Sequence, residues 1–389
     1  MGNERLTLCM VTPHLPPDQA ANALLPRLLG DRLTRDGHRV SYVSFRPRSG
    51  ASHQDGVVFI TPPPKDAPWR RALRITQART AVEVILKAWR VISRADVVHV
   101  HSNTFMNQVA VAVAAVAQRP FVLTHYGTEI WHRDAAPRAF DPFAWMNEHA
   151  SHVTYYSKRL FEHSREVGIV PLSASIVYPP VDERFQFASA KDQNEAKTLL
   201  GLGGARVLLN VKRLHPLAGQ KTLIRAFPRV LERVPGALLL IAGEGESRPE
   251  LEAAIRELGL GRAVRLLGLV DNRELPRYYR AADVFVLPSL LEAFPTVAAE
   301  ALACGTPVVS ADHPGGLELL ELFPEDVAIV PRQDPEALAR GLAEALEAPR
   351  RASSSTLARI ASEFRPDRAY ARYLDIYRQA TAARGAPIA

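Results

Sequence analysis

The sequence predicts an α/β protein built from two doubly wound parallel sheets. Short apolar runs alternate with amphipathic helical stretches in both halves of the chain, which is typical of buried parallel strands joined by crossover helices. The alternation breaks once, over residues 175–204, where paired prolines, a polar run and a Gly-rich end indicate an interdomain linker. A length of 389 residues also suits about two or three domains.

The first half accounts for one sheet. We expect strands within residues 5–13, 40–45, 96–102, 120–128 and 152–157. Leucines at helical spacing follow the first of these runs, and an Ala/Val-rich helix follows the third. Right-handed crossovers place the carboxyl ends of all these strands along one edge. Residues 1–180 are therefore assigned to an N-terminal Rossmann-like domain.

The second half repeats this rhythm. Apolar runs start near residues 205, 237, 263, 283, 307 and 327, and helices are predicted at 219–234, 249–258, 273–282, 296–303 and 335–346. A Ser-rich break at 353–355 precedes a last helix at about 368–382. Residues 200–365 are assigned to a second Rossmann-like domain, and we expect the two domains to face each other across a ligand-binding cleft.

Composition excludes several classes of protein. The two cysteines, Cys9 and Cys304, cannot form a disulfide framework or a cysteine-based metal cluster, and they suit a reducing compartment. A net charge of +7 is compatible with an anionic ligand or membrane surface and is too diffuse to indicate nucleic acid. We find no signal peptide and no apolar stretch long enough to span a bilayer, so we expect a cytoplasmic protein.

The most informative stretch is PSLLEAFPTVAAEALACGTPVVSADHPGG, which contains Glu292 and Glu300. Their spacing puts Glu292 in the turn before a helix and Glu300 in its second turn, so they do not form a carboxylate dyad. A carboxylate can accept hydrogen bonds from vicinal sugar hydroxyls. The amide groups of Phe294, Pro295 and Thr296, at a helix start, suit a phosphate or hydroxyl oxygen. The alternative is that neither residue binds a ligand, Glu292 being an acid at the helix start and Glu300 an exposed helical residue.

This stretch resembles the signature of the retaining glycosyltransferase family 4 (glycosyl transferases group 1), which has the two-Rossmann GT-B fold. The similarity continues back through residues 238–270 and 210–227, and it is weaker in RDGHRVSYVS, DVVHVHS and FVLTHYGTEI. The resemblance implies transfer of a sugar from a nucleotide donor, most often a uridine diphosphate sugar. It also implies that residues 1–180 serve the acceptor side, that residues 200–365 bind the donor, and that the last helix, 366–389, packs back on the first domain.

The resemblance also assigns roles to residues. Glu300 is expected on the ribose, Glu292 on the donor sugar as a catalytic residue, Arg213 on the diphosphate, and His125 beside the sugar as a second catalytic residue. Without this context, a single histidine at a strand end such as His125 is more often a packing residue than a catalytic one, and the alternative for Arg213 is a surface cation. We interpret His99 as a packing residue and His101 as a cleft residue. The predicted donor-binding residues are Arg213, Lys221, Gly243, Glu244, Val270, Phe294, Pro295, Thr296 and Glu300.

Two positions depart from the family pattern. The family usually has a lysine where this chain has Ala218, and Lys221 or Lys212 could supply the missing charge. The first strand-to-helix loop carries Gln19, Ala20, Ala21 and Asn22 in place of paired glycines, and the added Cβ atoms crowd a donor phosphate there. These departures keep a non-catalytic relative open as an alternative.

The mechanism follows from the leaving group, a nucleoside diphosphate whose charge needs cations and amide groups. No Asp-x-Asp pair occurs in the sequence, so we predict transfer without a metal or other cofactor, the nucleotide sugar being the co-substrate. The family retains anomeric configuration, and no carboxylate nucleophile is identified. An alternative is a nucleotide-sugar epimerase or hydrolase on the same fold. The acceptor is not identified: it can be lipid-linked, a glycan or a small molecule.

Residues 65–94 are strongly basic, with eight cations and two acids. Ala78, Val82, Ile85, Leu86, Trp89 and Ile92 recur there at helical spacing. One interpretation is a helix whose apolar face meets the core and whose basic face is solvated. The other is a peripheral contact with the inner membrane face, or an anionic acceptor site.

Overall fold

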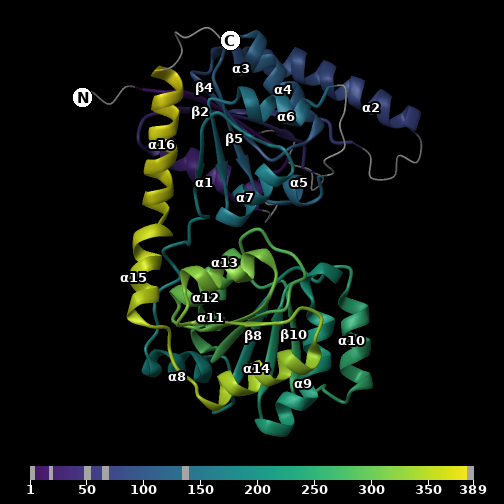
Figure 1. Ribbon diagram of the computed structural model, residues 1–389, viewed down its shortest axis with the longest axis vertical. Helices are drawn as coiled ribbons and strands as arrows, with labels where there is room; N and C mark the ends of the chain where they lie inside the picture. Colours follow the sequence, from purple (N-terminus) through teal and green to yellow (C-terminus); the bar gives the residue numbers. More distant parts are fainter. Residues whose placement is uncertain (1–4, 17–20, 48–53, 64–69, 134–139, 383–389) are drawn as a thin grey trace. The chain divides into compact units, whose positions relative to one another are not determined.

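The computed structural model describes residues 5–16, 21–47, 54–63, 70–133 and 140–382. The chain divides into two compact units (Figure 1). Unit 1 comprises residues 1–177 and 370–389, and unit 2 comprises residues 178–369. Gln19, Ala20 and the predicted helix end at 383–389 lie outside the described residues.

Unit 1 contains a seven-stranded parallel sheet with the order β3-β2-β1-β4-β5-β6-β7. Its strands are β1 (Thr7–Thr12), β2 (Arg39–Phe45), β3 (Val57–Ile60), β4 (Val97–His101), β5 (Phe121–His125), β6 (His152–Tyr155) and β7 (Ala174–Ile176). The five predicted strands are confirmed. The sequence analysis missed β3 and β7, which are short edge strands with partly exposed residues, so their apolar signal is weak.

The helices of unit 1 flank this sheet. They are α1 (Ala21–Arg35), α2 (Arg70–Glu83), a π-helical turn (Val84–Ala88), α3 (Trp89–Arg94), α4 (Phe105–Val116), α5 (Thr128–Trp131), α6 (Pro142–His149) and α7 (Lys158–Glu166). The last helix, α16 (Pro366–Ala382), contributes its residues from Tyr370 onward to this unit. There the Tyr377 hydroxyl lies 2.7 Å from His99 Nδ1 on β4, so this helix is anchored to the core of the sheet.

Unit 2 contains a six-stranded parallel sheet with the order β10-β9-β8-β11-β12-β13. Its strands are β8 (Val207–Val211), β9 (Leu238–Ala242), β10 (Val264–Gly268), β11 (Val284–Leu287), β12 (Val308–Ala311) and β13 (Val327–Val330). Its helices are α8 (Ala190–Leu199), a 3-10 turn (Pro216–Ala218), α9 (Gln220–Arg233), α10 (Arg248–Glu257), α11 (Leu275–Ala281), α12 (Thr296–Ala303), α13 (Pro314–Leu322), α14 (Pro335–Glu347) and α15 (Ser354–Glu363). The α/β class with two doubly wound parallel sheets is thus confirmed.

Two predicted breaks are wrong in their local detail. The linker region contains α8, which starts with a capping box in which Ser189 and Asp192 each bond the other's backbone N–H. The Ser-rich segment starts α15, because the Ser353 side chain accepts a hydrogen bond from Thr356 N. Serines before a helix act as caps, and the sequence analysis interpreted them as loop residues.

The faces of the basic helical stretch also differ from the core-facing interpretation. Thr80, Val84, Ala88 and Ile92 are buried, whereas Val82, Ile85, Leu86 and Trp89 are exposed. Buried positions four residues apart would drift by about 40° per step on a regular helix. The looser π-helical turn at Val84–Ala88 offsets this drift and keeps them on one face. Of the six apolar residues in the predicted stripe, only Ile92 is fully buried.

Both sheets have the same strand order around their first strand, counted as 3-2-1-4-5-6 within each unit. In such sheets, the strand order reverses between strands 1 and 4, and ligands bind outside the carboxyl ends of the strands at this point. In unit 1 this switch point lies between β1 and β4, and in unit 2 between β8 and β11. The residues that follow these strands are therefore the first candidates for a functional site.

Candidate functional site

A charged pair spans the switch point of unit 2. Lys212 follows β8 directly, Glu292 lies five residues beyond β11, and Lys212 Nζ is 2.6 Å from Glu292 Oε1. The side chains remain 29% and 15% exposed, so the pair is partly solvated and accessible. Close by, burial lowers the pKa of His313 to about 4, an effect that Glu292 opposes and Lys212 reinforces. His313 is therefore neutral near pH 7, and its Nδ1 accepts the N–H of Gly316 to cap α13.

Arg213 and Lys221, the two predicted donor-binding cations, differ in their surroundings. Arg213 is exposed directly after Lys212 and has no ion pair with any described residue. Lys221 lies on α9 and forms an ion pair with Glu250 of α10. Both side chains of that pair are about half exposed. The structure therefore places Arg213 beside the Lys212–Glu292 pair in sequence and Lys221 in a separate surface pair.

The predicted glycine turn holds the cationic loop in place. At Gly243, φ is +144°, and a Cβ atom there would lie 2.0 Å from the carbonyl oxygen of Lys212. Leu214 N donates to Glu244 O at 3.0 Å, which ties the loops after β8 and β9 together. The Glu244 side chain is ion-paired with Arg248 at 2.6 Å. Gly243 thus allows the loop that carries Lys212 and Arg213 to pack closely.

The segment before α12 offers main-chain donors, with one correction. Pro295 has no N–H, so it cannot donate as the sequence analysis expected of this segment. The N–H groups of Phe294 and Thr296 precede the first helical hydrogen bond, which Ala298 donates to Pro295 O at 2.9 Å. The Phe294 ring is buried against Tyr178 and Phe364, so this residue can offer a ligand only its backbone.

Glu300 lies in the second turn of α12, as predicted, and is partly buried. Burial raises its pKa to about 7, and nearby Asp182 adds to this, whereas a hydrogen bond from Tyr279 and the charge of Arg184 oppose it. The Tyr279 hydroxyl donates to Oε2 at 2.8 Å. Val270, another predicted donor-binding residue, is partly buried two residues beyond β10. The desolvated Glu300 carboxyl is therefore suited to accept hydrogen bonds from a ligand.

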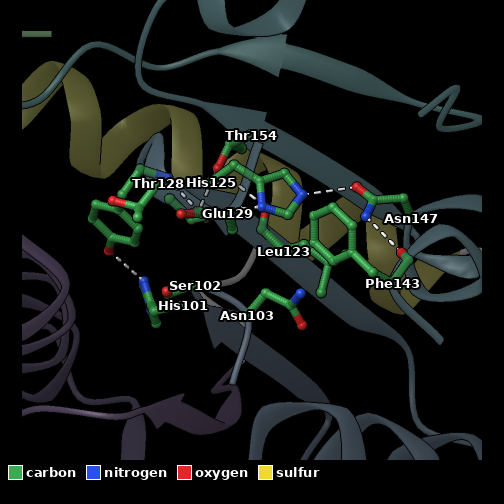
Figure 2. A network of polar contacts seen from close by, with 12 residues as sticks. His101, Ser102, Asn103, Leu123, His125, Thr128, Glu129, Phe143, Asn147 and Thr154 are labelled. Atoms are coloured by element: carbon green, nitrogen blue, oxygen red, sulfur yellow. Dashed lines mark hydrogen bonds and ion pairs between the residues drawn. The ribbon is translucent and has the colours of Figure 1, made fainter. Parts of the chain in front are cut away.

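In unit 1, His125 ends β5 within a set of polar contacts (Figure 2). Its Nε2 is 2.8 Å from Asn147 Oδ1, and its Nδ1 is 3.4 Å from Glu129 Oε1. Asn147 Nδ2 donates to Phe143 O, which leaves Oδ1 to accept a hydrogen bond from His125 Nε2. His125 is 1% exposed, so a substrate could reach it only after its surroundings rearranged.

His99 and His101 are both fully buried on β4, with ring centroids 3.9 Å apart. His99 contacts Tyr377 and Thr124 through its two ring nitrogens, each at 2.7 Å, which confirms it as a packing residue. His101 Nδ1 lies 2.8 Å from the Tyr126 hydroxyl, and burial lowers its pKa to about 3. This edge of unit 1 therefore carries neutral histidines near pH 7.

Sequence reasoning missed Glu129, Asn147 and Tyr279. Glu129 lies on α5, four residues after His125, and the turn at Gly127 between β5 and α5 brings their side chains together, so no helical spacing in the sequence indicates the contact. Asn147 and Tyr279 come from helices far away in the sequence, and only the fold brings them to His125 and Glu300.

Comparisons with known proteins agree with this architecture. Residues 192–361 match the family model described as glycosyl transferases group 1, and residues 27–185 match that described as glycosyltransferase family 4. An uncharacterized glycosyltransferase of Methanocaldococcus jannaschii is 27% identical over 87% of this chain and 88% of its own length. The D-inositol 3-phosphate glycosyltransferase 2 of Catenulispora acidiphila is 34% identical over 68% of this chain, which spans 60% of that relative.

Solved structures share the fold. The HepE protein of Anabaena, in a complex with UDP and glucose, superimposes with a TM-score of 0.73. The comparison covers 95% of this chain and 99% of that one at 22% identity.

Proposed function

The chain belongs to glycosyltransferase family 4 (glycosyl transferases group 1) and has the GT-B fold; on this premise, we propose that it transfers a sugar from a nucleoside diphosphate sugar to an acceptor. The anomeric configuration of the sugar would be retained in this transfer. The observation that carries the proposal is the Lys212–Glu292 pair at the switch point of unit 2, next to the exposed Arg213. Together they offer a carboxylate for sugar hydroxyls and cations for a diphosphate.

Departure of the nucleoside diphosphate is the step that these cations would assist. As the anomeric C–O bond breaks, negative charge grows on the diphosphate oxygens, and a planar guanidinium can bind two of them at once. Ala218 is buried and uncharged, and Lys221 lies on α9 in a surface pair with Glu250, whereas Lys212 directly follows β8 at the switch point, so we assign the second cation to Lys212. When the donor binds, Glu292 would accept sugar hydroxyls while Lys212 turns to the phosphate.

The other end of the donor would be held by α12 and the loop after β10. Glu300 has one oxygen bonded to Tyr279, which leaves its other oxygen for the ribose hydroxyls. The N–H groups of Phe294 and Thr296 would receive phosphate or sugar oxygens, and Val270 would lie near the base. A uridine donor is supported by the HepE complex with UDP and glucose, which shares the fold.

We propose that turnover needs no metal ion, because Lys212 and Arg213 already provide positive charge where the leaving group would lie. The relatives in the comparisons carry glycosyltransferase names, which does not favour the epimerase or hydrolase alternative. His125 is proposed to act beside the donor sugar, with Glu129 and Asn147 fixing its ring.

A thermal-shift screen over UDP-, GDP- and ADP-sugars tests the proposal, because a ligand that binds only the folded state raises the melting temperature. We expect a shift with one nucleotide series, which persists in EDTA and is lost in Glu292→Ala. Slow release of the nucleoside diphosphate without acceptor, followed by chromatography, would then establish turnover. A shift without any release or transfer would instead support the non-catalytic relative.

A further inference from the structure

The outer face of the helical stretch from Ile75 to Arg94 exposes large apolar side chains. Leu86 is 77% exposed, Ile75 64%, Val82 53%, Ile85 47% and Trp89 42%. Monomeric soluble proteins rarely expose so many large apolar side chains together on one element. The opposite face, with Val84, Ala88 and Ile92, is fully buried, so the stretch is already folded and fixed to unit 1. In Figure 1, α2 extends away from the sheet of this unit.

Cations flank this apolar stripe. Arg79, Lys87, Arg90 and Arg94 lie on the same stretch, against the single carboxylate of Glu83. Glu83 binds Arg79 at 3.1 Å and Lys87 at 2.9 Å. Arg90 and Arg94 are exposed and have no ion pair with any described residue. The face therefore combines exposed apolar groups with a net positive charge.

We propose that this face, made of residues 75–94, docks on the surface of an anionic lipid bilayer with the helix axis in the plane of the interface. The apolar stripe enters the boundary between headgroups and acyl chains, where Trp89 also finds its preferred depth. The long stems of Lys87, Arg90 and Arg94 let their charges reach lipid phosphates. No helix in the described part of the chain is long and apolar enough to cross a membrane, so the contact is peripheral.

Charge complementarity selects a bilayer over a second copy of the chain. Two copies of this face would bring two surfaces of like net charge together, and like charges repel. An anionic membrane attracts them, by an amount that salt screens. The proposal is independent of the donor chemistry, since it concerns unit 1 alone.

Co-sedimentation of the full chain with vesicles tests it. We expect binding to a phosphatidylcholine–phosphatidylglycerol mixture at low salt, weak binding to phosphatidylcholine alone, and loss of binding at high salt. Leu86→Ser should lower the partition coefficient about ten-fold or more, because a large apolar group no longer inserts. Arg90→Gln should lower it about five-fold. Both positions are exposed, so the fold should be retained.

Matched controls separate this face from general stickiness. Leu172→Ser removes a leucine that is 88% exposed outside the stretch, and Arg256→Gln removes an exposed cation in unit 2; both should bind as the wild type does. Absence of binding to anionic vesicles at low salt overturns the proposal, as does an equal loss in the controls. A dimer in solution that Leu86→Ser dissociates, without vesicle binding, also overturns it. Nucleotide-sugar thermal shifts should be unchanged in all four variants, so failure here leaves the proposed transfer untouched.

Discussion

The two switch points of the molecule have the same strand order but differ in whether their polar side chains are charged and exposed or buried. In unit 2, the residues beyond β8 and β11 are charged and partly solvated, as in the Lys212–Glu292 pair and the exposed Arg213. In unit 1, β4 ends at His101, which is fully buried and has a pKa lowered to about 3 by burial. One edge therefore carries accessible charge, whereas the other carries buried histidine, tyrosine and threonine side chains beside the little-exposed carboxylate of Glu129.

This difference indicates which of the two edges is suited to bind an ionised ligand. A diphosphate needs cations that are already charged near neutral pH and that need not be uncovered first. Burial lowers the pKa of His99 and His101 and so opposes their protonation, whereas the Arg213 guanidinium is exposed. The switch point of unit 2 thus presents accessible charges, whereas β4, at the switch point of unit 1, anchors α16 through His99.

The difference between the two edges predicts that Arg213 is needed for donor turnover. Arg213→Met should lower the rate of donor turnover about 10²–10³-fold, because one donor to the leaving-group charge is removed. The control is Arg225→Met, an exposed arginine on α9 without an ion pair to any described residue, which should retain the wild-type rate. Release of the nucleoside diphosphate measures both. Equal rates in the two variants would contradict the assignment of the charged edge.

The raised pKa of Glu300 predicts that donor affinity depends on pH. If only the ionised carboxylate binds the ribose, a pKa of about 7 makes donor affinity rise about ten-fold between pH 6 and pH 8. Glu300→Gln should weaken donor binding by about 1–3 kcal/mol at pH 8 and remove most of this pH dependence. Calorimetric titration at several pH values measures it, and a wild-type affinity that is flat with pH would argue against the role.

The stability of the protein without donor should change with pH in the opposite direction to donor affinity. The folded-state pKa of Glu300 lies above 4.5, the ordinary value for a glutamate, so the native protein holds this proton more tightly than the unfolded chain does. The free energy of unfolding should therefore fall as pH rises from about 4.5 to about 7 through this group. Glu300→Gln should be more stable than the wild type at pH 8 when no donor is present, as denaturant titration can establish.

The parts of this picture that the sequence predicts are those with strong local signals. Buried strands such as β11 consist of continuous apolar runs, and α12 begins and ends at the predicted residues because the turn and helix residues lie together in the sequence. Contacts between distant segments could not be predicted in this way. Tyr279 reaches Glu300 from α11, and Tyr377 reaches His99 from the last helix, since only the packing brings them together.

In the helical stretch from residue 75 to 94, the prediction of buried residues from apolar spacing is wrong for a different reason. Val82 and Leu86 each lie two residues from the buried Val84, about 200° around a regular helix, and both are exposed. The apolar spacing predicts that they are buried, so it selects the wrong face of the helix, and the π-helical turn at Val84–Ala88 keeps Ala88 and Ile92 on the buried face.

The anchoring role of unit 1 is tested by Tyr377→Phe. This change leaves His99 Nδ1 without its partner in a fully buried site, which should cost about 1–3 kcal/mol of unfolding free energy. Tyr278→Phe, a partly buried tyrosine in unit 2, serves as the control and should change it little. Urea denaturation followed by circular dichroism gives both values. Donor binding to Tyr377→Phe should be normal, because the charged edge belongs to unit 2.

The smallest effect is expected at Lys221, the predicted donor-binding cation that the structure pairs with Glu250. Both side chains are about half exposed, so water already screens their attraction, and Lys221→Ala should change stability by about 0–1 kcal/mol. Because we assign the second cation to Lys212, the affinity for the donor should not change in Lys221→Ala and should fall in Lys212→Met. Calorimetric titration of the two variants under the same conditions decides between the lysines. A loss confined to Lys221→Ala would show that the pair with Glu250 opens to admit the diphosphate, and the second cation would then be Lys221.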